Sequence, residues 1–307
     1  MSSENTQVKI KPADYKSDTH PIWCPGCGDF GVLSSLYRAL AQLQLPPENV
    51  AVVSGIGCSS RLPGYMATYG FNAVHGRILP IATGVKMANP EITVIGAGGD
   101  GDGFSIGIGH IPHAARRNID MTYIVMDNEI YGLTKGQLSP TSKTGDVTKT
   151  SVYGSIDRPI EPIPFMLSVG ATFVARAYAG NPKHLADMIV QGIQHKGFAY
   201  IDALSPCRTF RGLEQKNLLD EKVYYLDEGS DHDPTDKNRA WELASRNNGL
   251  ACGVFYKEDI PTYDERYKEI RENAQGKGMI PIKDIIQRYI PRDGTVARTA
   301  ESSGQTK

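Results

Sequence analysis

Short apolar runs alternate with longer amphipathic segments along the first two thirds of the chain. The run 50–53 is apolar and rich in β-branched valine, which is typical of a strand buried on both faces. Between 27 and 43 the apolar residues recur at helical spacing, and Pro46 and Pro47 end that segment. The same patterns predict helices at 77–88, 102–117 and 182–195 and strands at 92–96, 121–126 and 198–203.

Strands that alternate with helices predict a doubly wound α/β fold with a mainly parallel sheet, because right-handed crossovers place helices on both faces. In such sheets, ligands bind beyond the carboxyl ends of the strands. We therefore expect the segments that follow the strands to converge on one edge of the sheet: 54–60, 98–102, 127–134 and 204–207.

The alternation ends near residue 211, which divides the chain into an α/β domain, 1–210, and a C-terminal extension, 211–307. Within the domain, 131–164 is rich in Thr, Ser, Gly and Pro and predicts a long functional loop. Within the extension, 263–275 predicts a polar helix, and 291–307 predicts a disordered end.

Charge and composition narrow the possible partners. The chain of 307 residues has 33 Lys and Arg against 34 Asp and Glu, which disfavours nucleic-acid binding and a polybasic membrane patch. The N-terminus is polar, and no apolar run approaches the ~18 residues that a spanning helix needs, so we expect a cytoplasmic protein without membrane contact. The 32 glycines gather in runs such as GAGGDGDG, which is typical of a bound phosphate group.

The strongest single motif is GDGD at 99–102, which follows one predicted strand, together with Asn128 after the next. Mg²⁺ prefers carboxylate, amide and backbone oxygens beside phosphates, which Asp100, Asn128 and the carbonyl of Ile130 would supply. The spacing resembles the diphosphate-binding motif of thiamine diphosphate enzymes. The alternative is a glycine turn in an ordinary nucleotide-binding fold, although no G-x-G-x-x-G dinucleotide fingerprint follows the first strand.

The five cysteines form a second candidate centre. The pair in Cys24-Pro-Gly-Cys27 by itself fits a redox dithiol, half of a zinc site or two cluster ligands. Cys58, in GIGCSSR, and Cys207, in SPCRTF, would lie at the same edge of the sheet. Four converging thiolates suit structural zinc or a four-iron cluster, and the lack of a second C-x-x-C pair favours iron–sulfur. Cys252 stands apart, and its role stays open.

Together the motifs WCPGCGD, SGIGCSSR, HGR, GDGD and DNEIYGLTKGQLSPTS resemble, in order over 20–210, the β subunit of 2-oxoacid:ferredoxin oxidoreductases. The resemblance implies a thiamine diphosphate-binding domain of the PP type, with Mg²⁺ and one 4Fe-4S cluster. It also implies a larger α subunit in a dimer of αβ pairs, ferredoxin as electron acceptor and coenzyme A as co-substrate. The implied reaction is oxidative decarboxylation of a 2-oxo acid, which can run in reverse to fix CO₂ in a reductive TCA cycle.

The resemblance also assigns residues by position. Cys24, Cys27, Cys58 and Cys207 become the cluster ligands, and Asp100, Asn128 and Ile130 the Mg²⁺ ligands. Contacts to thiamine diphosphate are implied for Ile56, Gly57, Cys58, Ser59, Ser60, His75, Gly99, Gly101, Asp102, Tyr131, Gly132, Leu133 and Thr134. Two alternatives stay open: a non-redox thiamine diphosphate decarboxylase subunit, and a non-catalytic, zinc-stabilised nucleotide-binding module. Metal analysis of protein purified without oxygen would separate both from the leading interpretation.

The substrate expected is 2-oxoglutarate, converted to succinyl-CoA and CO₂, in preference to pyruvate. Its second carboxylate must be neutralised in a dehydrated pocket, and two cationic residues, Arg61 and Lys135, stand in the motif loops. Arg61 is the stronger candidate for the distal carboxylate because a planar guanidinium can bind both oxygens. Arg61, Lys135 and His75 are therefore the candidate catalytic residues of an enzyme of the 2-oxoglutarate synthase type.

Overall fold

The computed structural model describes residues 9–226, 231–246, 250–275 and 280–290. The chain divides into two compact units, Met1–Asp264 and Glu265–Lys307. The disordered end predicted at 291–307 lies outside the described residues. Among the helices that the structure describes, none combines the length and the apolar composition needed to cross a membrane.

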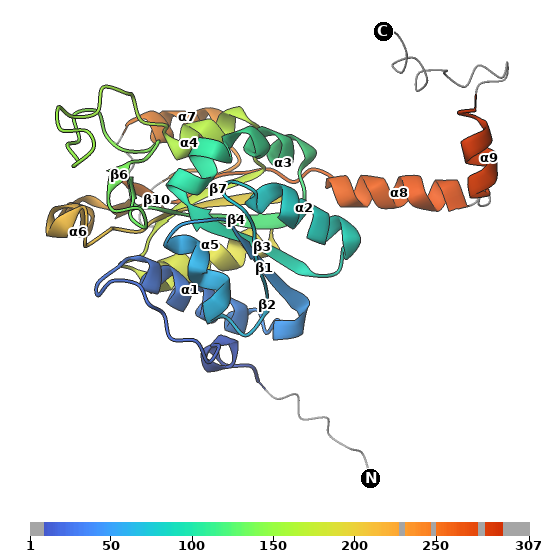
Figure 1. Cartoon of the computed structure of the whole chain (residues 1–307), viewed down its shortest axis with the longest axis horizontal. Helices are drawn as coiled ribbons and strands as arrows, with labels where there is room; N and C mark the ends of the chain where they lie inside the picture. The colour runs from blue at the N-terminus through green and yellow to red at the C-terminus, as the bar shows by residue number, and fades with distance from the viewer. Residues whose placement is uncertain (1–8, 227–230, 247–249, 276–279, 291–307) are drawn as a thin grey trace, which may run out of the picture. The chain divides into compact units, whose positions relative to one another are not determined.

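An eight-stranded sheet forms the centre of the first unit (Figure 1). Its strand order is β2-β1-β3-β4-β8-β7-β10-β9, and every pairing in it is parallel except that of β10 with β7. The mainly parallel α/β fold expected from the sequence is confirmed. The strands of this sheet are β1 (Val50–Ser54), β2 (Tyr69–Asn72), β3 (Thr93–Gly99), β4 (Met121–Asp127), β7 (Phe173–Tyr178), β8 (Phe198–Leu204), β9 (Tyr224–Tyr225) and β10 (Ala251–Lys257), and a separate hairpin pairs β5 (Ile130–Tyr131) with β6 (Gln137–Leu138).

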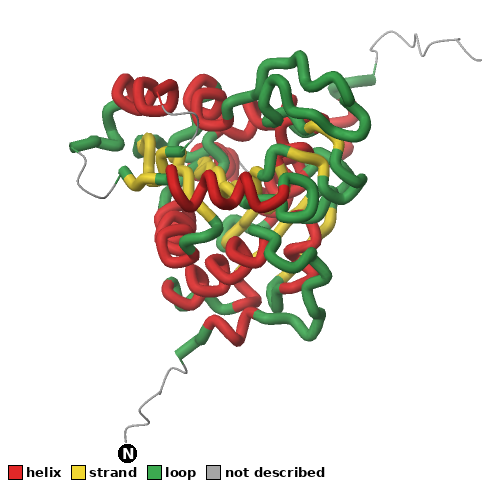
Figure 2. Tube along the Cα trace, turned by 90° about the vertical axis from the view of Figure 1, so that its left-hand side faces the viewer, coloured by secondary structure: helices red, strands yellow, loops and turns green. Residues whose placement is uncertain are grey.

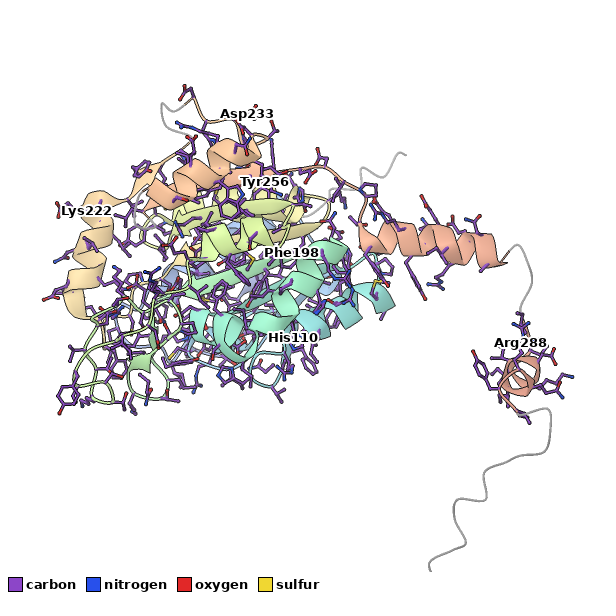
Figure 3. All side chains as sticks on the ribbon, turned by 90° about the horizontal axis from the view of Figure 1, so that it is seen from above. His110, Phe198, Lys222, Asp233, Tyr256 and Arg288 are labelled. Carbon is purple, nitrogen blue, oxygen red and sulfur yellow. The ribbon has the colours of Figure 1, made fainter. Side chains whose placement is uncertain are left out.

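Helices cover both faces of the sheet (Figure 1). On one face, two helices pack against strand residues such as Val52 and Ile124. On the other face, four helices enclose residues such as Val53 and Phe198, the latter labelled in Figure 3. Neighbouring residues of β1 thus point into opposite cores, as the pleat requires. The first face is covered by α1 (Asp29–Gln42) and α5 (Pro182–Gln194), the second by α2 (Ile78–Ala88), α3 (Ile111–Arg117), α4 (Pro162–Ser168) and α7 (Lys237–Arg246).

The alternation of strands and helices continues past residue 211, contrary to the expectation that it ends there. The helix α6 (Gly212–Lys222) follows β8, and β10 then joins the same sheet antiparallel to β7. The polar helix predicted at 263–275 is confirmed as α8 (Tyr263–Gln275), and the second unit also contains α9 (Ile282–Gln287). The C-terminal extension therefore adds β9 and β10 to the sheet of the first unit.

The helix predicted over 102–117 is not continuous. The chain forms a π-helical turn at Asp102–Ile106 and a 3₁₀ turn at Ile108–His110 before α3 begins. Ser105 has non-helical dihedral angles, φ −100° and ψ −105°. Pro112 lacks the N–H that a regular helix would direct to the carbonyl four residues earlier, so a new helix starts there.

A buried ion pair joins β7 to β8 in the middle of the sheet. Arg176 and Asp202 are opposite each other in the parallel register, and Arg176 Nε donates to Asp202 Oδ2 at 2.7 Å. Arg176 is 4% exposed and Asp202 is 0% exposed, so neither charge is solvated. The guanidinium also lies 5.8 Å from the ring of Phe255 on β10. The pair therefore links three adjacent strands.

We expect Arg176→Met to lower the free energy of unfolding by about 3–5 kcal/mol, because Asp202 would stay buried without a counter-charge. The double variant Arg176→Met/Asp202→Val should recover most of this loss, since an apolar replacement of a buried pair is close to neutral. Urea unfolding followed by circular dichroism measures both values. A double variant as unstable as the single one would attribute the loss to packing and not to the unpaired charge.

Candidate functional site

Four strand ends meet at one edge of the sheet, as the strand pattern predicts. β1, β3, β4 and β8 are successive neighbours and run parallel, so the segments that follow them start side by side. Figure 2 looks onto this loop-rich end of the first unit. The GIGCSSR, GDGD, NEIYGLT and SPCRTF segments therefore share one region, although they are far apart in the chain.

Asp100 is buried at the end of β3 against the segment that follows β4. Its side chain is held by Thr141, whose Oγ1 donates to Asp100 Oδ2 at 2.7 Å and also lies 2.9 Å from Asp127 Oδ1. The backbone N–H groups of Asn128 and Gly101 lie near the same carboxylate and lower its pKa. Asp100 and Asn128, which the motif singled out, are thus adjacent.

A sharp turn positions the rest of this predicted metal site. Asn128 Oδ1 accepts the N–H of Ile130 at 3.1 Å, and Asp127 Oδ1 accepts the N–H of Glu129 at the same distance. Glu129 has φ 58°, in the left-handed region that an L-residue adopts only in tight turns. Both hydrogen bonds fold the chain back on itself, which keeps Ile130 beside Asn128, the residue next to Asp100.

Burial makes the ionised forms of Asp100 and Asp127 unfavourable. It raises the pKa of Asp100 to about 6, although hydrogen bonds from Ser139 and Thr141 act in the opposite direction. Burial, followed by the charge of Asp100, raises the pKa of Asp127 well above its usual range. The Thr141 hydroxyl has one hydrogen and can donate to only one of the two carboxylates. A divalent cation beside Asp100 would offset the excess negative charge, and these oxygen donors are the kind that Mg²⁺ prefers.

Glycine allows close backbone packing at the same place. A Cβ on Gly101 would lie 2.3 Å from the ring of Tyr131, and a Cβ on Gly55 would lie 2.1 Å from the carboxylate of Asp102. The Tyr131 hydroxyl donates to the Gly101 carbonyl at 3.1 Å. The GDGD turn is therefore in direct contact with the segments that follow β1 and β4, and no side chain could be added at these glycines.

The second aspartate of the motif binds protein groups. Asp102 Oδ1 accepts the N–H of Ile56 at 2.9 Å and that of Gly76 at 2.8 Å, and it lies 2.6 Å from His75 Nδ1. Its other oxygen, Oδ2, is buried and accepts no hydrogen bond within the described part of the chain. The His75 side chain is 39% exposed, so it lies at the rim of the GDGD turn and is held through Nδ1.

Two of the four cysteines predicted to bind a cluster, Cys58 and Cys207, lie beside the segment that follows β4, and Cys24 and Cys27 are within electrostatic range of these two. A Cβ on Gly132 would lie 3.5 Å from Cys58 Sγ and 3.8 Å from Cys207 Sγ. Burial, with smaller contributions from the negative charges of Asp29, Cys207 and Cys24, raises the pKa of Cys58 to about 11. Burial also raises the pKa of Cys27, with added contributions from Cys207 and Cys58. Each of the four thiols thus lies within electrostatic range of another.

Cys252 lies elsewhere in the fold. It is fully buried on β10, in a small apolar cluster with Tyr178 and Leu219. The structure therefore separates it from the other four cysteines, as the spacing in the sequence suggested.

A buried carboxylate that the sequence analysis left without a role lies next to the cysteines. Asp29 is 0% exposed, and burial raises its pKa to about 6 against a 2.6 Å hydrogen bond from Ser205 Oγ, which lowers it. The preceding Gly28 packs on Ser205, where a Cβ would lie 2.6 Å from Oγ. Asp29 could have been selected from the sequence, because it is the acidic residue in the WCPGCGD motif. Thr141 and Asp127 could have been selected in the same way, because they stand in the SPTS and DNEIY motifs.

The two predicted cationic residues have different surroundings. Arg61 is exposed and lines an open pocket of about 250 Å³ together with His20, Tyr65 and Asn72, among others. Its charge lowers the pKa of Cys58, so it lies close to the cysteine site. Lys135 is exposed in the β5–β6 connection with φ 86° and does not line this pocket.

The other predicted cofactor contacts follow β1, β3 and β4. Ser59 and Ser60 are buried in the turn after β1, and a Cβ on Gly99 would lie 2.9 Å from Ser59 Oγ. Leu133 and Thr134 are exposed in the β5–β6 connection. Ile56 and Gly57, between β1 and Cys58, are exposed and half-buried, respectively.

Two family models match the chain in succession. The model described as thiamine pyrophosphate enzyme, C-terminal TPP binding domain, matches 55–203, and that of the C-terminal part of the pyruvate ferredoxin oxidoreductase beta subunit matches 207–272. The 2-oxoacid:ferredoxin oxidoreductase subunit beta of Saccharolobus solfataricus is 45% identical over 260 residues, 80% of this chain and 85% of the relative. The 2-oxoglutarate oxidoreductase subunit KorB of Mycobacterium tuberculosis is 46% identical over 205 residues, 67% of this chain and 55% of the relative.

A solved structure is similar over most of the chain. It is a 2-oxoglutarate:ferredoxin oxidoreductase from Magnetococcus marinus with 2-oxoglutarate, coenzyme A and succinyl-CoA bound. The TM-score is 0.87 at 45% identity, and the match covers 94% of this chain and 98% of the other. The resemblance inferred from the motifs is confirmed, and the chain belongs to the β subunits of the 2-oxoacid:ferredoxin oxidoreductases.

Proposed function

We propose that this chain is the β subunit of a 2-oxoglutarate:ferredoxin oxidoreductase, which with coenzyme A converts 2-oxoglutarate to succinyl-CoA and CO₂. It holds thiamine diphosphate through Mg²⁺, carries one 4Fe-4S cluster and passes electrons to ferredoxin. The names of the Mycobacterium tuberculosis relative and the Magnetococcus marinus structure support 2-oxoglutarate. Pyruvate, named in the family model over 207–272, is the competing substrate.

The contact at Gly132 carries this proposal. A Cβ on Gly132 would lie 3.5 Å from Cys58 Sγ and 3.8 Å from Cys207 Sγ, and Gly132 belongs to the same segment as Asn128. A segment with metal-binding oxygens at one end therefore lies against thiols at the other. Within the described residues, no three His, Cys, Asp or Glu side chains gather closely enough to hold one metal ion. The four cysteines come from three separate segments and lack a second C-x-x-C pair, which favours a 4Fe-4S cluster over structural zinc.

When bound, thiamine diphosphate supplies an electron sink for the loss of CO₂, and the cluster supplies a one-electron acceptor. The chain's own residues hold and orient these groups. Asp100, Asn128 and the Ile130 carbonyl would bind Mg²⁺, and Cys24, Cys27, Cys58 and Cys207 would ligate iron. His75 is held at Nδ1 by Asp102, which leaves Nε2 available to the cofactor or substrate.

Exposed apolar side chains beside His75 support an α subunit that completes the site. Ile56 is 44% exposed, Val74 70% and Ile106 53%. They are neighbours, because Ile56 is bonded to Asp102, and a Cβ on Gly76 would lie 2.6 Å from Ile106 Cγ2. Grouped apolar side chains beside a site mark a surface that a partner covers. We expect the larger α subunit to cover this rim, in a cytoplasmic dimer of αβ pairs.

Arg61 supports a dicarboxylic substrate. It lines the pocket of about 250 Å³, and no acidic side chain in the described part of the chain forms an ion pair with it. Its planar guanidinium can bind both oxygens of a distal carboxylate, which pyruvate lacks.

Asp100→Ala should weaken retention of Mg²⁺ and thiamine diphosphate by more than about tenfold while leaving the iron content unchanged, because the two centres use different ligands. The measurement is iron, sulfide and thiamine diphosphate per chain after anaerobic gel filtration. Joint loss of iron and thiamine diphosphate would indicate general unfolding and would count against the assignment.

Cys207→Ala should remove or degrade the cluster, because one of its four thiolate ligands is lost. Cys252→Ala, the matched control within β10, should keep the full iron content. Iron analysis and the visible absorbance of anaerobically purified protein test both variants. An intact cluster in the Cys207 variant would mean that the fourth ligand is another group.

Arg61→Met should lower kcat/KM for 2-oxoglutarate by roughly 10- to 100-fold more than for pyruvate, because a hydrogen bond to a charged group is worth about 1.5–3 kcal/mol. Lys222→Met, at the exposed end of α6, is the control, since Lys222 does not line the pocket. Equal losses with the two acids would leave Arg61 a structural residue.

A further inference from the structure

The helix α6 lies beside the segment that follows β4 (Figures 1 and 3, in which Lys222 marks its end). One α6 side chain, the half-buried Gln215, makes two hydrogen bonds at this contact. Gln215 Oε1 accepts the N–H of Cys207 at 3.1 Å, and Gln215 Nε2 donates to the carbonyl of Asn128 at 3.1 Å. A single amide therefore joins a proposed iron ligand to a proposed Mg²⁺ ligand.

We propose that Gln215 is a positioning residue that holds the Cys207 segment and the Asn128 segment in a fixed relation to each other. This inference rests on the proposed function, because it gives Cys207 and Asn128 their metals. Gln215 touches neither metal and acts through the backbone of the two ligands. It belongs to 211–307, for which the motifs assigned no function.

The chemistry of glutamine explains why this residue type fits. A backbone N–H can only donate and a backbone carbonyl can only accept, so the bridge needs an acceptor and a donor on one side chain. A primary amide supplies both, and the two backbone partners fix its orientation. Glutamate would keep the acceptor and lose the donor. Leucine has a similar size and would lose both.

A second contact holds the same two segments together. Arg211 Nη2 donates to Glu129 Oε2 at 2.8 Å and to Asp146 Oδ2 at 2.6 Å. The Arg211 side chain is 15% exposed, so this ion pair is largely shielded from solvent. Arg211 should therefore keep α6 in place when Gln215 is changed, which separates the loss of the bridge from the loss of the helix.

The bridge also affects the surroundings of the Cys207 sulfur. Burial raises the pKa of the Cys207 thiol, and the backbone N–H groups of Phe210 and Thr209 act in the opposite direction, while the Arg211 N–H donates to the Cys207 carbonyl at 2.9 Å. Hydrogen bonds to ligand sulfurs stabilise a cluster and tune its potential. A bond from Gln215 to the Cys207 N–H fixes the start of this turn, so it should slow loss of iron.

The test uses the complete enzyme, purified without oxygen together with its α subunit. For Gln215→Leu we expect the Kd for Mg²⁺-thiamine diphosphate to rise about tenfold or more, and iron loss to a chelator to accelerate about threefold or more. For Gln215→Glu we expect weaker cofactor binding and a rate of iron loss close to wild type, because only the hydrogen bond to the Asn128 carbonyl is lost. Calorimetric titration of the cofactor-depleted enzyme and absorbance decay measure the two quantities.

Asn217, an exposed amide on the same helix, provides matched controls. Asn217→Leu and Asn217→Asp repeat the two changes without touching either segment, and both should behave as wild type. If Gln215→Leu matched Asn217→Leu in either quantity, or if Gln215→Glu and Gln215→Leu lost iron equally fast, the inference would be wrong. A wild-type enzyme without iron or without thiamine diphosphate binding would instead refute the proposed function.

Discussion

Parallel pairing of β1, β3, β4 and β8 is the constraint on which the candidate site depends. Strands that run in the same direction end at the same edge, and the crossover helices return the chain to the opposite edge each time. Cys58 follows β1, Asp100 follows β3, Asn128 follows β4 and Cys207 follows β8. A shift of one residue in the register of any of these strands would move its side chains to the other face of the sheet. The geometry of the site therefore depends on the observed register.

Buried negative charge distinguishes this edge from the rest of the sheet. Asp202 is compensated inside the protein by Arg176, and Asp102 Oδ1 accepts two backbone N–H groups. Asp100 and Asp127 share one hydroxyl, and burial raises the pKa of both. Burying an ionised carboxylate without a partner is strongly unfavourable, so a fold that places two together is suited to a cation. The local electrostatics thus agree with the family assignment.

The sequence by itself determined the fold class, four of the eight strands that the structure describes in the sheet, and the family. Apolar β-branched runs such as 50–53 are long enough to identify buried strands, and their alternation with helices already implies a shared ligand-binding edge. The motifs around Cys58, Asp100 and Asn128 could be recognised because close approach to phosphate or metal restricts the residue types. Each of these inferences depends on local pattern, which the linear sequence contains.

Tertiary structure decided what depends on partners distant in the chain. β7 was missed because Arg176 interrupts its apolar run, and only the opposite Asp202 on β8 makes that charge compatible with burial. Other hydrogen bonds of the site also join residues that are distant in the sequence. They are those of Asp102 with Ile56 and Gly76, of Thr141 with Asp100, and of Gln215 with Cys207 and Asn128. A polar side chain can be satisfied by water or by many protein groups. Its partner is selected only when the folded backbone brings one donor and one acceptor within about 3 Å and excludes solvent.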